Sequence, residues 1–156
     1  MNHYAILRIV TKLLIPYILL FGLYVQFHGD FGPGGGFQAG VIFAAGIILY
    51  GLVFGIGAAR RVAPAPVVER LIAVGLLIYA GTGIVGMLKG GNFLEYGVLA
   101  HDAEHGQHWG ILIVELGVGI TVAAVMITIF FAFAGRERTE CATKATRSWD
   151  FTITGS

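Results

Sequence analysis

Gly29-Asp30-Phe31-Gly32-Pro33-Gly34-Gly35-Gly36-Phe37-Gln38-Ala39-Gly40 is a glycine-rich stretch between two long runs of apolar residues. Inside a helix, a glycine costs about 1 kcal/mol relative to alanine and a proline costs about 3 kcal/mol, so we expect a turn here. Backbone N–H groups in this turn lack shielding side chains, and a helix that begins near Phe37 adds the positive end of its dipole. The stretch therefore predicts a place where an anion or another subunit approaches the backbone closely.

The composition indicates a membrane protein. The chain has 156 residues, of which 56% are hydrophobic and 12% are charged, and its mean hydropathy is +0.81. An ordinary soluble domain does not have this balance. Apolar runs of about 20 residues are long enough to cross a bilayer core of about 30 Å as helices. Because no strand-like alternation recurs at the spacing of a membrane barrel, we expect an all-α membrane protein.

Four apolar runs predict four transmembrane helices, at about residues 5–27, 37–59, 71–88 and 109–134. They form a transmembrane domain over residues 1–135, which is followed by a polar tail over residues 136–156. The tail lacks helical periodicity, so we expect it to be disordered or docked on a partner.

The distribution of positive charge predicts the orientation in the membrane. Nine of the ten lysine and arginine residues lie before the first span, at its start, between the second and third spans, or in the tail. By the positive-inside tendency, both termini are cytoplasmic. The glycine-rich stretch and the histidine-bearing connection before the fourth span then face outward together.

Small residues recur every four positions in the second predicted span. Gly36, Gly40 and Ala44 form one such series, and a second series follows at Gly51, Gly55 and Ala59. Small residues at this spacing form a groove that lets another helix approach closely within lipid. The pattern leaves open whether that helix belongs to this chain or to a partner. In the turn itself, we expect subunit contacts or a tight loop at Asp30, Pro33, Gly34, Gly35, Gly36, Phe37 and Gly40.

Glu115 is the single charged residue of the fourth predicted span. A charge within the bilayer core costs about 2.5 to 3.5 kcal/mol even on a mild scale, so this carboxylate must be paired, wetted or protonated. One interpretation is a proton- or cation-binding group on an ion path, with His108 two turns before it. The other is a carboxylate near the outer interface that pairs with a neighbouring helix and fixes the assembly.

His101, His105 and His108 would share one face if their segment were helical, and three imidazoles at this spacing are weak candidates for a zinc site. A solvated or partner-contacting loop is favoured over a metal site, because no group that would orient the imidazoles can be assigned. The sequence has one cysteine, Cys141, and no catalytic grouping or cofactor fingerprint. We therefore expect no enzymatic activity and no cofactor.

Three segments carry a resemblance to a known family. They are His28-Gly29-Asp30-Phe31-Gly32-Pro33-Gly34-Gly35-Gly36-Phe37-Gln38-Ala39-Gly40, Leu49-Tyr50-Gly51-Leu52-Val53-Phe54-Gly55, and Val114-Glu115-Leu116-Gly117-Val118-Gly119-Ile120-Thr121-Val122. The chain resembles the MnhB (MrpB) subunits of multisubunit Mrp sodium/proton antiporters. It departs from the family pattern at Asp30, where histidine is common, and at Ala39, where glycine is common.

The resemblance implies a small, non-catalytic subunit in a bacterial or archaeal cytoplasmic membrane. Its partners would be the other subunits of the antiporter, sodium ions, protons and the lipid bilayer. It would bind no nucleic acid. It would pack beside large subunits that resemble the ion-pumping subunits of respiratory complex I, and it would line the sodium path with them. Two alternatives remain: a membrane subunit of an energy-converting hydrogenase or related redox complex, and an autonomous small channel or metal sensor.

Overall fold

The computed structural model describes residues 3–29, 34–91, 93–94 and 103–153, with side chains described in residues 5–29, 34–91, 93–94 and 106–135. Within these residues the chain forms helices and no strand. The helices are α1 (His3–Phe27), α2 (Gly36–Phe54), α3 (Ile56–Val62), α4 (Ala65–Leu88) and α5 (Ala103–Ile153). Four segments are long and apolar enough to cross a membrane, at Ala5–Phe27, Gly36–Phe54, Ala65–Leu88 and Gly106–Gly135. The all-α fold class with four spans is confirmed, and the cytoplasmic position of the termini stays a prediction.

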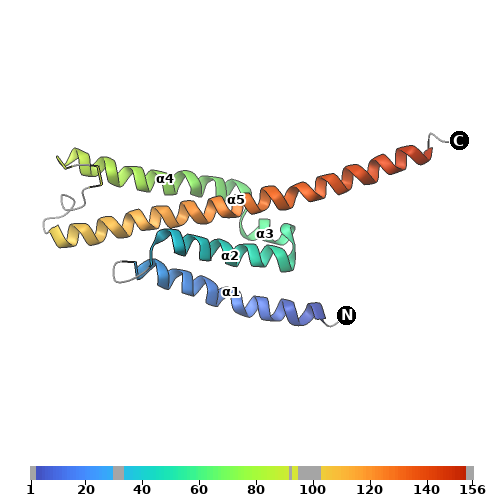
Figure 1. The fold of residues 1–156 in the computed structure, drawn as a ribbon, viewed down its shortest axis with the longest axis horizontal. Coiled ribbons are helices and arrows are strands. Elements are labelled where there is room, and N and C mark those ends of the chain that lie inside the picture. The colour runs from blue at the N-terminus through green and yellow to red at the C-terminus, as the bar shows by residue number, and fades with distance from the viewer. Residues whose placement is uncertain (1–2, 30–33, 92, 95–102, 154–156) are drawn as a thin grey trace.

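The four long helices lie side by side as a single layer in the order α1, α2, α5, α4 (Figure 1). α2 packs between α1 and α5, and α5 packs between α2 and α4, so α1 and α4 form the two edges. The end of α1, the start of α2, the end of α4 and the start of α5 meet at one end of the layer, and both termini lie toward the other (Figure 1). This agrees with the expected crossing pattern, in which the glycine-rich turn and the connection before α5 face the same side.

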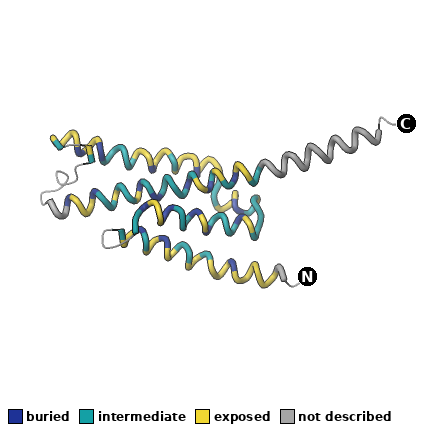
Figure 2. The backbone as a smooth tube through the Cα atoms, in the orientation of Figure 1, coloured by how far each residue is buried: buried dark blue, intermediate teal, exposed yellow. Residues whose placement is uncertain are grey.

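A layer one helix thick leaves most of its side chains uncovered (Figure 2). Between 11% and 28% of the residues in each spanning window are buried inside the chain. Large apolar side chains are exposed on every long helix, among them Leu77 at 70%, Leu88 at 82% and Phe133 at 71%. The buried core is small and consists of Ala44, Ala59, Val68, Ala124, Ile127 and Phe131. Lipid or other helices must therefore cover both faces of the layer.

Glycines bring the backbones of α2 and α5 into close contact. An ideal Cβ atom built on Gly40 would lie 2.6 Å from the carbonyl oxygen of Gly119 and 3.0 Å from Cβ of Val122. A Cβ on Gly36 would collide with the carbonyl oxygen of Glu115. Helices associate in lipid through this kind of close packing, since burial of apolar surface gives them no net drive. The first series of small residues in α2 therefore faces α5 of the same chain.

α4 and α5 meet through a second pair of glycines. A Cβ on Gly75 would lie 2.7 Å from the carbonyl oxygen of Gly117, and one on Gly117 would lie 3.0 Å from the carbonyl oxygen of Gly75. Thr121 also borders Gly75, and its hydroxyl donates a hydrogen bond of 2.8 Å to the carbonyl oxygen of Gly117. α5 thus packs closely against a neighbour on each side.

The second predicted span does not continue as one helix to residue 59. α2 ends at Phe54, because Gly55 adopts φ of +91°, a conformation that glycine tolerates and that breaks the helix. The N–H of Gly55 donates to the carbonyl oxygen of Gly51, and the short helix α3 follows. A Cβ on Gly51 would lie 3.3 Å from Cβ of Ala59, so the chain folds back here. The second series of small residues is therefore not a groove on a single helix.

Two other helix limits differ from the sequence prediction. α4 begins at Ala65 rather than near residue 71, because Pro66 stands in the first turn, where the missing N–H costs nothing. α5 continues from Ala103 to Ile153, so the segment expected to be a disordered or partner-docked tail is helical up to that residue. No glycine or proline occurs between Arg136 and Ile153, and arginine, glutamate, alanine and lysine favour helix there.

Cationic side chains gather on aromatic rings at the terminal end of the layer. The guanidinium carbon of Arg8 lies 5.9 Å and Nζ of Lys12 lies 5.6 Å from the ring centroid of Phe54. The guanidinium carbon of Arg60 lies 5.7 Å from the ring centroid of Phe131. Contacts of this kind stabilise a cation at a membrane boundary while its apolar stem stays in the lipid.

We predict that Gly75→Ala lowers the melting temperature of the purified protein in detergent, because the added methyl group forces α4 away from α5. Overpacking of this kind typically costs about 1–3 kcal/mol. Gly81→Ala is the matched control, since a Cβ at this position of the same helix meets nothing within 4 Å. Equal melting temperatures for the two variants would contradict the close packing of α4 on α5.

Candidate functional site

The glycine-rich turn joins the end of α1 to the start of α2. After α1 ends at Phe27, the N–H of His28 still donates to the carbonyl oxygen of Tyr24, and the two rings stack at 5.1 Å. Gly35 precedes α2 with φ of +145°, and α2 has no side-chain cap. The first turn of α2 therefore presents backbone N–H groups and the positive end of the helix dipole without a capping side chain of its own.

The carboxylate of Glu115, on α5, lies against this turn. An ideal Cβ on Gly29 would be 2.5 Å and 2.7 Å from its two oxygens, and one on Gly35 would be 3.2 Å from Oε1. The side chain is half-buried. A side chain at either position would occupy the space of the carboxylate. Glycine at positions 29 and 35 therefore allows the carboxylate to approach the backbone. The anion that the turn was expected to attract is a side chain of the same chain, located at the N-terminus of α2.

The backbones also meet beside the carboxylate. A Cβ on Gly36 would lie 2.7 Å from the carbonyl carbon of Glu115, and one on Gly119 would lie 3.1 Å from the carbonyl oxygen of Gly36. Gly34 sits over the last turn of α1, because its Cβ would lie 2.8 Å from the carbonyl oxygen of Val25. α1, the turn, α2 and α5 thus converge around one ionisable group.

The other candidate residues lie apart from this carboxylate or outside the described residues. His108 is exposed on α5, edge-on to the ring of Trp109 at 6.4 Å, and about 10 Å along the helix from Glu115. Among the described residues no three histidine, cysteine or acidic side chains cluster as metal ligands. His101, Asp30 and Pro33 fall outside the described residues, and the side chain of His105 is not described.

Of the residues expected at a loop or a subunit contact, Gly36 and Gly40 are buried against α5. Gly34 and Gly35 lie in the turn described above. Phe37 differs from them, because 64% of its side chain is exposed at the start of α2. A large apolar side chain in this position is suited to contact with lipid or another subunit.

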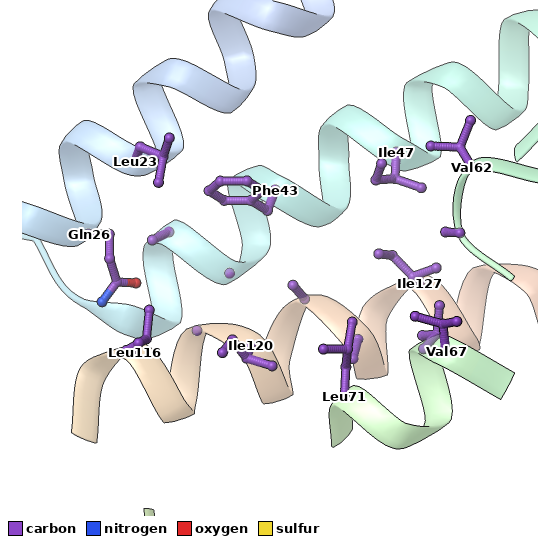
Figure 3. Close-up of a pocket in the computed structure, with 17 residues that line it drawn as sticks. Leu23, Gln26, Phe43, Ile47, Val62, Val67, Leu71, Leu116, Ile120 and Ile127 are labelled. Atoms are coloured by element: carbon purple, nitrogen blue, oxygen red, sulfur yellow. The ribbon is translucent and has the colours of Figure 1, made fainter. Parts of the chain in front are cut away.

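Gln26 is a polar residue of this region that the sequence reasoning missed. Its side chain is 7% exposed, and its Nε2 has no hydrogen-bond partner among the described residues. Its Oε1 lies 2.8 Å from an ideal Cβ on Gly119, so the amide is inserted between α1 and α5 (Figure 3). The available signal was one glutamine in the otherwise apolar end of the first span.

Comparison with known proteins places the chain in one family. Residues 6–128 match the family model described as a domain related to the MnhB subunit of Na+/H+ antiporters. A Staphylococcus haemolyticus protein named antiporter subunit mnhB2 is 35% identical over 140 residues, which covers 84% of this chain and 94% of the relative. A Staphylococcus epidermidis protein of the same name is 34% identical over 134 residues, with the same coverage.

We predict that Glu115→Ala relieves the effect of Gly29→Ala but not that of Gly36→Ala. The methyl group at Gly29 would meet only the flexible end of the Glu115 side chain, whereas the one at Gly36 would meet the backbone of residue 115. A double-mutant cycle of melting temperatures should therefore show a coupling for the first pair. The same coupling for both pairs, or for neither, would contradict the position of the carboxylate.

Proposed function

Because the chain belongs to the MnhB family of Na+/H+ antiporter subunits, we propose that it works as one membrane subunit of a multisubunit antiporter and exchanges no ions alone. Its neighbours are the complex-I-like ion-translocating subunits that the family resemblance implies. The membrane is the cytoplasmic membrane of a bacterium or archaeon, which is consistent with relatives from Staphylococcus. Membership of an antiporter family favours a transport protein over an enzyme.

The open layer is the observation that carries this proposal. Exchange of two cations needs a path enclosed on all sides and several ionisable groups along it. The described helices lie in one layer with most of their apolar side chains uncovered, and α5 offers one carboxylate between Gly106 and Gly135. The remaining walls and ionisable groups must then come from other subunits.

The inward position of the glycines indicates which surfaces meet those subunits. Gly40, Gly75 and Gly117 already contact helices of this chain. Partner contacts are therefore made by the large apolar side chains on the outer faces and by Phe37 at the turn.

Glu115 has the role of an anchor in this proposal: its charge holds the glycine-rich turn on α5. The position of the carboxylate against Gly29 and Gly35, at the N-terminus of α2, supports this role. A second role, contact with the sodium path, is favoured by one observation. The carboxylate is half-buried rather than enclosed, so water or a cation from a neighbouring subunit can reach it.

We expect Glu115→Gln to lower the amount of assembled antiporter while exchange per assembled complex stays close to wild type. Glutamine keeps the shape of the side chain but removes the charge that the helix N-terminus stabilises. Complex is quantified on native gels, and exchange is measured by fluorescence dequenching in everted vesicles. Normal assembly with a several-fold lower rate, or a higher sodium requirement, would reject the anchor role and support the sodium path.

The subunit role itself predicts that the chain reconstituted alone into vesicles exchanges no sodium for protons, whereas the purified complex does. Removal of the chain from the complex should abolish exchange. The same preparation tests the hydrogenase alternative, because an antiporter complex should contain no stoichiometric iron or nickel. Exchange by the isolated chain would overturn the proposal.

A further inference from the structure

Two cations of α1 converge on one aromatic ring of α2, and we name Arg8, Lys12 and Phe54 the cationic clamp. The guanidinium carbon of Arg8 and Nζ of Lys12 lie 5.9 Å and 5.6 Å from the centroid of this ring. Residues four apart on a helix have Cβ atoms about 5–6 Å apart, so both side chains leave the same face of α1. Phe54 is the last residue of α2. The clamp therefore gathers two positive charges where α1 packs on α2, at the terminal end of the layer (Figure 1).

No carboxylate on the adjoining helices balances these charges. α1, α2 and α3 contain no aspartate or glutamate, and α3 adds Arg60 and Arg61 at the same end. The two acids with described side chains lie elsewhere: Glu115 is at the glycine-rich turn, and Glu69 is on α4, at the opposite edge of the layer. An aromatic ring attracts a cation but does not neutralise it, and like charges four residues apart on a helix repel. An anion bound between the two cations would therefore stabilise the clamp.

The position of the ring sets the depth of the clamp in the membrane. The 19 residues of α2 rise about 28 Å, which is close to the thickness of a hydrocarbon core. With the glycine-rich turn at one boundary of the core, Phe54 lies at the other. Lysine and arginine near a helix end extend their charges toward the headgroups while their stems stay in the lipid. The clamp thus places two cations at the level of phospholipid phosphate groups.

The surface around the clamp is apolar. Ile6, Ile9 and Leu13 of α1 are 63%, 67% and 63% exposed. α1 is an edge helix, so the other described helices leave its outer face uncovered. A ligand that satisfies this surface needs an anionic group for the two cations and hydrocarbon for the side chains beside them. A phospholipid of net negative charge has both, whereas inorganic phosphate has only the first.

We propose that the cationic clamp binds the phosphate group of an anionic membrane phospholipid such as phosphatidylglycerol. The guanidinium of Arg8 donates a pair of hydrogen bonds to the phosphate oxygens, and Lys12 adds a second positive charge. Phe54 keeps both cations at one depth, and the acyl chains lie over Ile9 and Leu13. Basic sites of this kind select anionic lipids on the cytoplasmic side, which is the side predicted for this end. This inference is independent of ion exchange.

The first test measures the melting temperature of the full-length chain in a nonionic detergent. We expect added phosphatidylglycerol to raise it by several degrees, and phosphatidylcholine or inorganic phosphate at the same concentration to leave it unchanged. Arg8→Gln should lose most of the rise. Arg70→Gln is the matched control, because Arg70 stands at the same position in α4 as Arg8 in α1, five residues after the start. The proposal would be overturned by an equal rise with phosphatidylcholine, or by equal rises in the two variants.

A charge-preserving variant separates loss of the site from loss of the fold. Arg8→Lys combined with Lys12→Arg keeps both cations on the same face and should retain the rise with phosphatidylglycerol. Lys12→Gln should reduce it. If the charge-preserving pair lost the rise as fully as Arg8→Gln, the phosphate would not be held by the two charges, and the proposal would fail.

The second test identifies the occupant in native membranes. A photoreactive amino acid at Ile9, the residue after Arg8, should form adducts with phospholipid. Arg8→Gln should lower the share of phosphatidylglycerol among these adducts several-fold. Adducts with another protein in place of lipid would overturn the proposal, because an acidic segment of a partner subunit would then occupy the clamp.

Discussion

The structure depends on the close approach of two backbones, those of α2 and α5. In water, apolar burial would hold the two helices together, but inside a bilayer the lipid tails are as apolar as the helices. The remaining attraction comes from tight packing, which requires residues without bulk at the contact. Gly36 and Gly40 on α2 and Gly119 on α5 meet this requirement. The positions of the Glu115 backbone and of the Gln26 amide depend on the distance that these glycines permit.

This close approach has two consequences. On one side of the contact, the N-terminus of α2 reaches the carboxylate of Glu115, so an acid that would be costly in lipid lies against backbone and a helix dipole. On the other side, the amide of Gln26 is trapped against Gly119 with an unpartnered N–H at the end of an apolar groove. The positions of the ionisable group and of the buried amide therefore share one structural cause.

Much of the fold could be predicted from the sequence because membrane helices have a strong local signal. The four apolar runs and the small residues of α2 were visible without a structure, and so was the unusual acid at Glu115. Local patterns gave no reason to connect Glu115 with the glycine-rich turn, because the two are about 80 residues apart in the chain. A series of glycines also predicts close packing but does not show which helix packs there. In the structure, that helix is α5 of the same chain.

The errors at helix limits have equally physical causes. Glycine is common inside membrane helices, so its presence at position 55 did not predict a break. The helix ends there because Gly55 adopts a positive φ, which only the structure shows. The polar segment after Gly135 lacks an apolar face, so no helix was predicted there. It nevertheless continues α5, and extending an existing helix does not carry the cost of nucleating a new one. Such limits depend on the state of the preceding residues rather than on the segment itself.

The packing of α2 on α5 is tested most directly by a disulfide between cysteines at Gly40 and Val122, introduced after Cys141 is replaced by serine. An ideal Cβ on Gly40 lies 3.0 Å from Cβ of Val122, and disulfides join Cβ atoms about 3.5–4.5 Å apart, a separation that a small shift provides. We expect an intramolecular bond to form in native membranes under mild oxidation. A pair at Gly40 and the exposed Ile113 should form none. If Gly40 crosslinked to Ile113 instead, or to Val122 only between subunits, the account would be contradicted.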